Sequence, residues 1–178
     1  YNKIMTNELD AKLCADYPEI FRDRHAPMNK TAMCWGFSCD DGWYALIDEL
    51  CAHLSHPLQT AQTSYANAQK MYANVQAGTE TSTYRREKFT EAYVEECRQK
   101  VEEERQRIPV AFQVKEKFGM LRFNVQNATD EQMQLITFAE NLSSRICEKC
   151  GSMKDAVPGG KGWIKTLCPP CREGKSQS

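Results

Sequence analysis

Apolar residues recur at the spacing of one helix face between residues 43 and 54, which predicts an amphipathic helix there. They follow the i, i+3, i+4, i+7 pattern and should therefore face the core. Asp40 or Asp41 is the expected N-cap. A shorter helix is predicted from residue 7 and should end near Pro18, because proline has no amide hydrogen to give to a helix interior. The apolar face of the longer helix comprises Trp43, Leu46, Ile47, Leu50, Cys51 and Leu54.

A change of composition near residue 58 predicts a helical hairpin over residues 58–108. Its first helix is otherwise made mainly of Gln, Asn, Thr and Ser, and Gly78 separates it from a second helix over residues 84–107. Apolar residues recur at spacings of three and four in both helices, but most are small or amphipathic. We therefore expect a thin core that leans on the main domain or on a partner chain. The two stripes are Leu58, Ala61, Tyr65, Ala68, Tyr72 and Val75, and then Phe89, Tyr93, Cys97 and Val101.

Alternating residues after Pro109 predict a β-hairpin with its turn at Phe118 and Gly119. One face of the hairpin should be buried, and the opposite face carries Gln113, Lys115, Lys117, Arg122 and Asn124. The residues expected on the buried face are Val110, Phe112 and Val114 in the first strand and Leu121, Phe123 and Val125 in the second.

A last helix is predicted after the hairpin. Thr129 and Gln132 have the spacing of a capping box. This helix leads directly to the cysteine-rich end of the chain, so no flexible linker is expected between them. Its expected apolar residues are Met133, Ile136, Phe138, Leu142 and Ile146.

Four cysteines near the end of the chain have the spacing of a structural zinc site. Cys147 and Cys150 form one Cys-x2-Cys pair, and Cys168 and Cys171 form a second pair seventeen residues later. The glycine that follows the first pair should adopt a positive φ. A turn is expected at residues 158–160, followed by a strand over residues 162–167. The alternatives are four unrelated thiols or two disulfides. A disulfide framework is found mainly in short secreted chains. Four thiolates leave no open coordination position, so a zinc ion here would be structural.

The predicted fold class is therefore α+β. A small core of helices and a β-hairpin should occupy residues 1–145, with the helical hairpin of residues 58–108 inserted into it, and a four-cysteine zinc ribbon should occupy residues 146–174.

Three segments carry a resemblance to a family of proteins encoded in phage and prophage genomes, most of them hypothetical proteins. The segments are MCWGFSCDDGWYALIDELC at residues 33–51, QVKEKFGMLRF at residues 113–123, and ICEKCG with GWIKTLCPPC within residues 146–171. Together they cover about a third of the chain. The resemblance implies a phage protein that is not part of the virion and is made in the host cytoplasm. It implies no catalytic residue.

Composition and charge narrow the functional classes only a little. The 178 residues carry a net charge of −1, but the part from Arg145 onward has seven basic and three acidic residues, while the rest has sixteen basic and twenty-one acidic ones. A four-thiolate zinc centre carries a net charge of −2, and some of the lysines are expected only to balance it. No apolar run is long enough to cross a membrane, and we expect no membrane partner. Nine cysteines without a signal peptide favour a reducing cytosol.

Other cysteines and histidines allow further chemistry. Cys34 or Cys39 could act as a nucleophile with His25, His53 or His56, but nothing in the sequence fixes such a pair. A second metal site could use Cys34, Cys39, Cys51 and His53 or His56. The competing interpretation is that these cysteines are small core residues, and the buried helix stripe that contains Cys51 favours it. We therefore expect no enzyme.

The predicted function is binding. We expect a phage accessory protein that binds a host macromolecule, most simply a host protein, through the helical hairpin or the ribbon, for example to inhibit antiviral defence. The alternatives are a nucleic-acid-binding ribbon or a protein that sequesters a small nucleotide signal, and a homodimer is a further option. Basic residues beside an aromatic ring can hold phosphate and stack on a base. The candidate binding residues are Trp163, Lys161, Lys165, Arg172, Lys115, Lys117 and Arg122.

Overall fold

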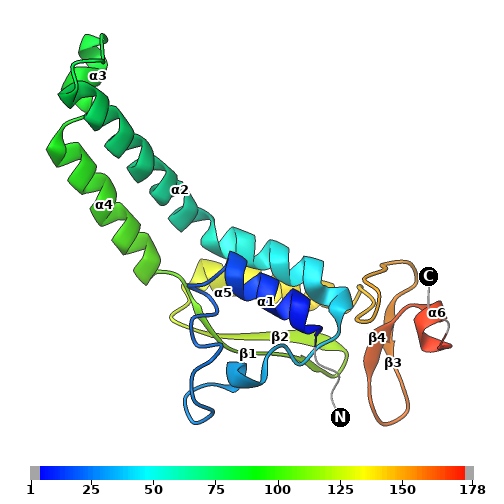
Figure 1. Ribbon diagram of the computed structural model, residues 1–178. Coiled ribbons are helices and arrows are strands. Elements are labelled where there is room, and N and C mark those ends of the chain that lie inside the picture. Colours follow the sequence, from blue (N-terminus) through cyan, green and yellow to red (C-terminus); the bar gives the residue numbers. More distant parts are fainter. Residues whose placement is uncertain (1–4, 175–178) are drawn as a thin grey trace. The chain divides into compact units, whose positions relative to one another are not determined.

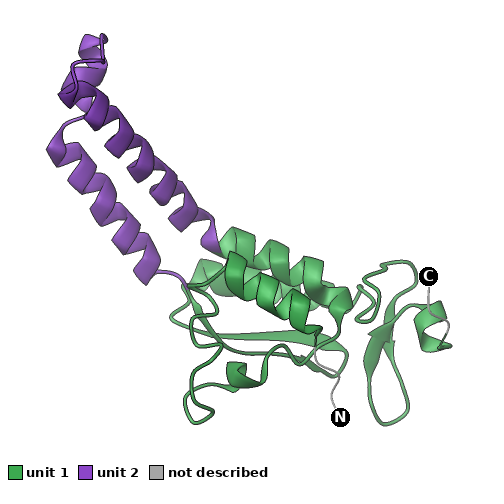
Figure 2. Ribbon diagram, viewed as in Figure 1, with its two compact units in different colours: residues 1–54, 109–178 green, residues 55–108 purple. Residues whose placement is uncertain are grey.

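The computed structural model describes residues 5–174, which form an α+β protein (Figure 1). The chain divides into two compact units (Figure 2). Unit 1 comprises the segments up to Leu54 and from Pro109 onward, and unit 2 comprises Ser55–Ile108. The cysteine-rich end of the chain belongs to unit 1. Among the described residues, no helix has both the length and the apolar character that crossing a membrane requires.

Unit 1 is built around a β-hairpin. The helical elements that precede the hairpin are α1 (Asn7–Asp16), two short 3-10 helices, η1 (Ala32–Trp35) and η2 (Asp41–Trp43), and the first part of α2 (Tyr44–Gln76). Helix α1 ends before Pro18, as predicted. The hairpin consists of β1 (Val110–Lys117) and β2 (Met120–Gln126), and α5 (Asp130–Ser143) follows it. The remaining elements are β3 (Val157–Gly159), β4 (Lys165–Leu167) and α6 (Pro169–Arg172).

Helix α2 buries the predicted stripe but is longer than expected. The side chains of Trp43, Ile47, Leu50, Cys51 and Leu54 are all at most 3% exposed, and Leu46 is half-buried. We predicted separate helices before and after residue 57. The structure instead has one helix of 33 residues with Pro57 inside it. A proline within a helix removes one backbone hydrogen bond and crowds the carbonyl four residues earlier, and here the flanking residues nevertheless continue the helix.

The β-hairpin has the predicted turn and most of the predicted inward face, since Val110, Val114, Leu121 and Phe123 are buried. Phe118 and Gly119 have φ values of 53° and 77°, the pair of positive φ angles that a two-residue type I′ turn requires. The register shifts between Ala111 and Gln113. Because a bulge reverses the alternation of side chains, Ala111 is buried and Phe112 is only half-buried, which corrects the prediction for Phe112.

Both edges of the hairpin are covered by other parts of unit 1. On the β2 side, the backbone N–H of Leu121 donates to Ser143 Oγ at 2.8 Å, and that of Phe123 donates to Glu140 Oε1 at 2.8 Å. On the β1 side, Ser38 exchanges backbone hydrogen bonds with Val114 and Glu116. These hydrogen bonds occupy backbone groups that could otherwise recruit another strand.

The core of unit 1 is aromatic and aliphatic. The ring of Phe21 packs edge-on against the rings of Phe37 and Phe123, with centroids 5.0 and 6.2 Å away. Helix α5 starts with the predicted capping box of Thr129 and Gln132. Its buried face is formed by Ile136, Ala139 and Ser143, whereas Phe138, another apolar residue of this helix, is 64% exposed.

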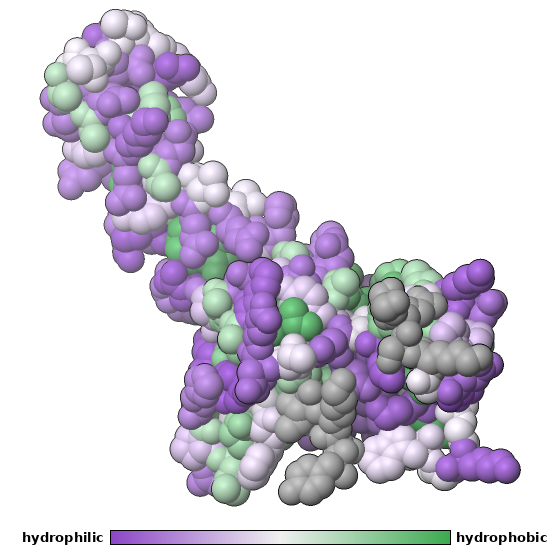
Figure 3. Space-filling view, turned by 45° about the vertical axis from the view of Figure 1, so that its right-hand side comes forward, coloured by the Kyte–Doolittle hydropathy of each residue, from purple (hydrophilic) through white to green (hydrophobic). Residues whose placement is uncertain are grey.

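Unit 2 is a helical arm with a thin core. After the C-terminal part of α2, the chain forms α3 (Thr83–Lys88) and α4 (Glu91–Gln106), which runs in the direction opposite to α2 (Figure 1). The single helix predicted over residues 84–107 is broken at Phe89, because Thr90 caps a new helix by accepting a hydrogen bond from the backbone of Tyr93. The face of this arm seen in Figure 3 is mainly hydrophilic. Its buried apolar side chains are Leu58, Ala61, Ala68, Phe89, Val101 and Ile108.

Candidate metal centre and adjoining groove

The four predicted cysteines meet at one point of unit 1. The Sγ atoms of Cys147, Cys150, Cys168 and Cys171 all lie within 4.8 Å of one another, and those of Cys150 and Cys168 are 3.6 Å apart. This separation is far longer than the disulfide bond of about 2.05 Å. It is close to the sulfur–sulfur separation of about 3.8 Å in a tetrahedral site with metal–sulfur bonds of about 2.3 Å. The cluster can therefore hold a metal ion, and the disulfide alternative does not fit.

The pKa values of these thiols are shifted in opposite directions. Burial has the largest effect on the pKa of Cys147 and raises it, but hydrogen bonds from the backbone of Cys168, Cys150 and Lys149 lower the pKa to about 7. Burial, and then the neighbouring thiols of Cys150 and Cys168, raise the pKa of Cys171. A bound metal ion would stabilise the thiolate form of all four side chains, because a coordinating thiol is deprotonated outright.

The cysteine ribbon, residues 146–174, is held by a short sheet and one arginine. Strands β3 and β4 pair in antiparallel fashion. Arg172 Nη2 donates to the carbonyl oxygen of Val157 at 2.7 Å and also reaches those of Lys165 and Leu167 at 3.4 Å. The predicted strand over residues 162–167 is shorter, and Pro158 and Gly159 belong to β3 and not to a turn. Gly151 has the predicted positive φ, 79°.

The ribbon is docked on the segment that starts α2. The backbone N–H of Gly42 donates to the carbonyl oxygen of Glu148 at 2.8 Å, and Trp43 Nε1 donates to that of Ile146 at 2.9 Å. Trp43 is fully buried. Ile146, just before the first cysteine pair, and Glu148, between its two cysteines, are therefore fixed against the core.

A buried carboxylate strengthens this junction. Glu148 is 1% exposed, and its Oε1 accepts a hydrogen bond from the backbone N–H of Asp40 at 3.1 Å. Lys165 Nζ lies 3.2 Å from both carboxylate oxygens of Glu148 and 3.5 Å from Asp40 Oδ2. Burial lowers the pKa of Lys165, but the two carboxylates raise it by more, and burial in turn raises the pKa of Glu148.

The structure thus places two of the candidate binding residues in internal contacts. Lys165 belongs to the ion pair at the junction, and Arg172 donates to carbonyl oxygens within the ribbon. Arg122 is half-buried, with its Nη1 3.9 Å from Glu140 Oε2. Lys161 is exposed and lies in the loop between β3 and β4.

The other three candidates, Lys115, Lys117 and Trp163, line one groove. The groove has a volume of about 390 Å³ and lies between the turn of the β-hairpin and the β3–β4 loop of the ribbon. The hairpin turn is fixed there, since Thr166 Oγ1 donates to the carbonyl oxygen of Gly119 at 2.6 Å. The full lining is Lys115, Glu116, Lys117, Phe118, Gly162, Trp163 and Ile164.

Glu116 orients both sides of this groove. Its Oε1 accepts a hydrogen bond from the backbone N–H of Gly119 at 2.7 Å, and its Oε2 accepts one from Trp163 Nε1 at 3.2 Å. The rings of Phe118 and Trp163 are 67% and 58% exposed. Lys117 Nζ lies 5.5 Å from the centroid of the Phe118 ring, within the range of a cation–π contact.

Sequence reasoning missed Phe118, Glu116 and Glu148 as parts of these sites. The sequence places Phe118 in the turn, and a two-residue turn requires positive φ values that a bulky residue rarely adopts, so Phe118 at this position is a signal in itself. Glu116 and Glu148 carry no such signal, because Trp163 lies 47 residues from Glu116 and Asp40 lies 108 residues from Glu148 in the sequence.

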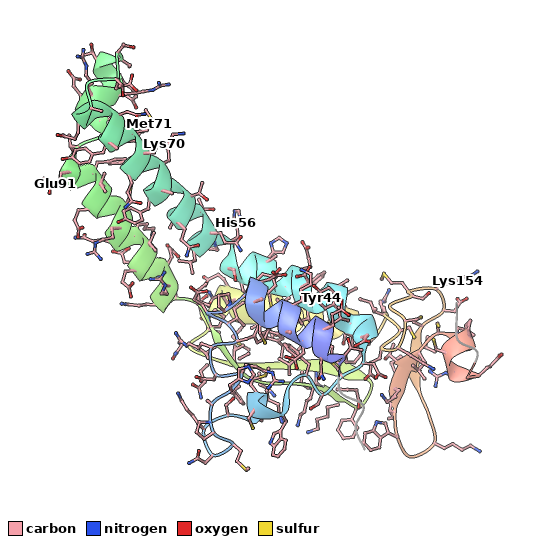
Figure 4. All side chains as sticks on the ribbon, viewed as in Figure 1. Tyr44, His56, Lys70, Met71, Glu91 and Lys154 are labelled. Atoms are coloured by element: carbon pink, nitrogen blue, oxygen red, sulfur yellow. The ribbon has the colours of Figure 1, made fainter. Side chains whose placement is uncertain are left out.

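The alternative second metal site is not formed. Among residues 5–174, the only group of three or more His, Cys, Asp or Glu side chains placed to hold a metal is the four-cysteine cluster. Cys39 and Cys51 are fully buried, and burial raises the pKa of both thiols. His53 is exposed beside Glu49, and His56 points away from α2 (Figure 4). The interpretation of Cys39 and Cys51 as core residues is confirmed.

Comparisons with known proteins give no relative from which a function could be carried over. No family model, no curated protein and no solved structure matches this chain.

Proposed function

We propose that this protein is a non-enzymatic binding protein that recognises a host macromolecule through the groove between the β-hairpin turn and the cysteine ribbon. The observation that carries the proposal is the exposure of Phe118 and Trp163 on a groove whose two walls are joined by hydrogen bonds. Large exposed aromatic rings in a concave, pre-formed site are typical of recognition surfaces.

The proposed metal is zinc, with a structural role. A site made only of cysteine thiolates favours soft or borderline ions such as Zn²⁺. Four thiolates fill its coordination sphere, so the ion would hold the ribbon and with it one wall of the groove. Cys147, Cys150, Cys168 and Cys171 would be its ligands.

The proposed setting is an infected cell. The three segments that resemble the phage and prophage family meet in unit 1: Ser38 pairs with Val114 and Glu116, Gly42 with Glu148, and Glu116 with Trp163. This convergence supports the view that the resemblance reflects one shared site. A phage accessory protein acting in the host cytoplasm, for example against antiviral defence, would be consistent with such a site.

Site-specific photo-crosslinking tests the proposal. A photoreactive amino acid at Lys117 should capture a macromolecule from host lysate, and the adduct should disappear in the background of Trp163→Ala. The matched control is Lys154, which extends from the ribbon outside the groove (Figure 4) and should give no such adduct. Equal capture from both positions, or none from Lys117, would rule out recognition through the groove.

A further inference from the structure

We propose that the occupant of this groove is a single-stranded nucleic acid, with bases stacking on Phe118 and Trp163 and phosphates paired with nearby lysines. This inference rests on the function proposed above and names its partner. Its basis is that one groove combines two exposed aromatic rings with two lysines.

The indole ring of Trp163 is ordered before a ligand binds. It is oriented by the hydrogen bond from its Nε1 to Glu116, and the backbone that carries Phe118 is set by the two-residue turn. Rings that are already ordered lose little conformational entropy when a ligand binds. Stacking between a base and an aromatic ring does not depend on base identity, because every base has a π-face.

The charges around the groove favour a polyanion. Lys115 and Lys117 line it, and the exposed Lys161 directly precedes the lining residue Gly162. Glu116 is the one acidic lining residue, and its carboxylate oxygens already accept hydrogen bonds from Gly119 and Trp163. Three lysines around one engaged carboxylate leave the site positive.

The lysines favour a nucleic acid over a protein as the occupant of the groove. It is depleted in protein–protein interfaces, where aromatic residues and arginine are enriched. Lysines beside exposed aromatic rings are instead the combination that single-strand binders use, with a basic surface for the backbone and rings for the bases. A duplex offers its phosphates to the lysines but keeps its base faces stacked and out of reach.

Fluorescence anisotropy of a labelled oligothymidylate, titrated with the zinc-loaded full chain at low salt, tests the inference. Phe118→Asn should weaken binding about tenfold, and Asn accepts the positive φ of this turn position. Trp163→Ala should weaken it by a similar factor. Lys117→Glu should weaken it and also lower the dependence of affinity on salt, because one phosphate contact is lost. The control variant Lys154→Glu should leave the affinity unchanged, and a duplex of the same length should bind more weakly.

The possible failures of this inference can be separated from failure of the proposed function. If the wild-type chain does not bind single strands at low salt while Lys117 still crosslinks to a host protein, the nucleic-acid inference is wrong and recognition through the groove stands. Equal affinity for duplex and single strand, or binding unaffected by Phe118→Asn and Trp163→Ala, would also overturn the inference. Metal content and the circular dichroism spectrum of each variant confirm that a loss of binding is not a loss of folding.

Discussion

Gly42 lies directly against the backbone of Glu148. The N–H of Gly42 donates to the carbonyl oxygen of Glu148 at 2.8 Å, and a Cβ atom at residue 42 would overlap the carbonyl oxygens of Cys147 and Glu148. A Cβ atom at Gly151 would in turn lie 3.1 Å from the carbonyl oxygen of Gly42. The two backbones therefore touch without side chains between them, which joins the start of α2 to the first cysteine pair.

Replacing Gly42 with alanine should loosen this junction. The added methyl group has no space, so we expect Gly42→Ala to lower the free energy of unfolding by about 1–3 kcal/mol and to speed the release of metal to a chelating dye. Ala45→Ser, an exposed change in the first turn of α2, should stay within about 0.5 kcal/mol of wild type. Urea denaturation measures the first effect. Unchanged stability of Gly42→Ala would show that the ribbon is not held by this contact.

Lys165 and Glu148 should stabilise the fold only when both are present. Lys165→Met leaves the buried Glu148 carboxylate without its cation, which we expect to cost about 3 kcal/mol. Adding Glu148→Gln removes the stranded charge and should restore part of that loss. The double variant is compared with both single variants by urea denaturation. If the two losses simply add, the side chains are not coupled and the proposed role of Lys165 is wrong.

Local patterns in the sequence predicted the helices, the hairpin and the cysteine site, because each depends on spacing within a short segment. The Trp43 stripe, the turn at Phe118 and the cysteine pairs are of this kind. Phe112 and the groove depend on features that no local spacing marks. Phe112 left the core because a bulge reversed the strand's alternation, and no spacing rule marks that bulge. The groove could not be predicted, since it arises where the ribbon loop meets the hairpin turn some 45 residues away in the chain.

Ser143 should be important for the covered edge of β2. Its hydroxyl oxygen accepts the backbone N–H of Leu121, and both groups are buried. Ser143→Ala leaves that N–H without a partner, so we expect a loss of about 1–3 kcal/mol. Ser144→Ala is the matched control, because Ser144 is partly exposed and bonds only the carbonyl oxygen of Asn141 within its own helix turn. Thermal or urea unfolding of both variants decides the point, and equal losses would contradict a special role for Ser143.

Removal of the metal should unfold the ribbon selectively. Structural zinc contributes on the order of 10–16 kcal/mol in small peptide sites, and the ribbon has only the short β3–β4 sheet and α6 to replace it. We expect one zinc ion per chain by elemental analysis. After chelation, the backbone amides of Cys147, Gly151 and Arg172, which bond within the ribbon, should lose protection from hydrogen exchange, while those of α4 keep theirs. Cys150→Ser should abolish metal binding, whereas Cys97→Ser, on α4 in unit 2, should not change the metal content. Ribbon amides that stay protected without metal would show that docking against Gly42 and Trp43 alone holds the ribbon folded.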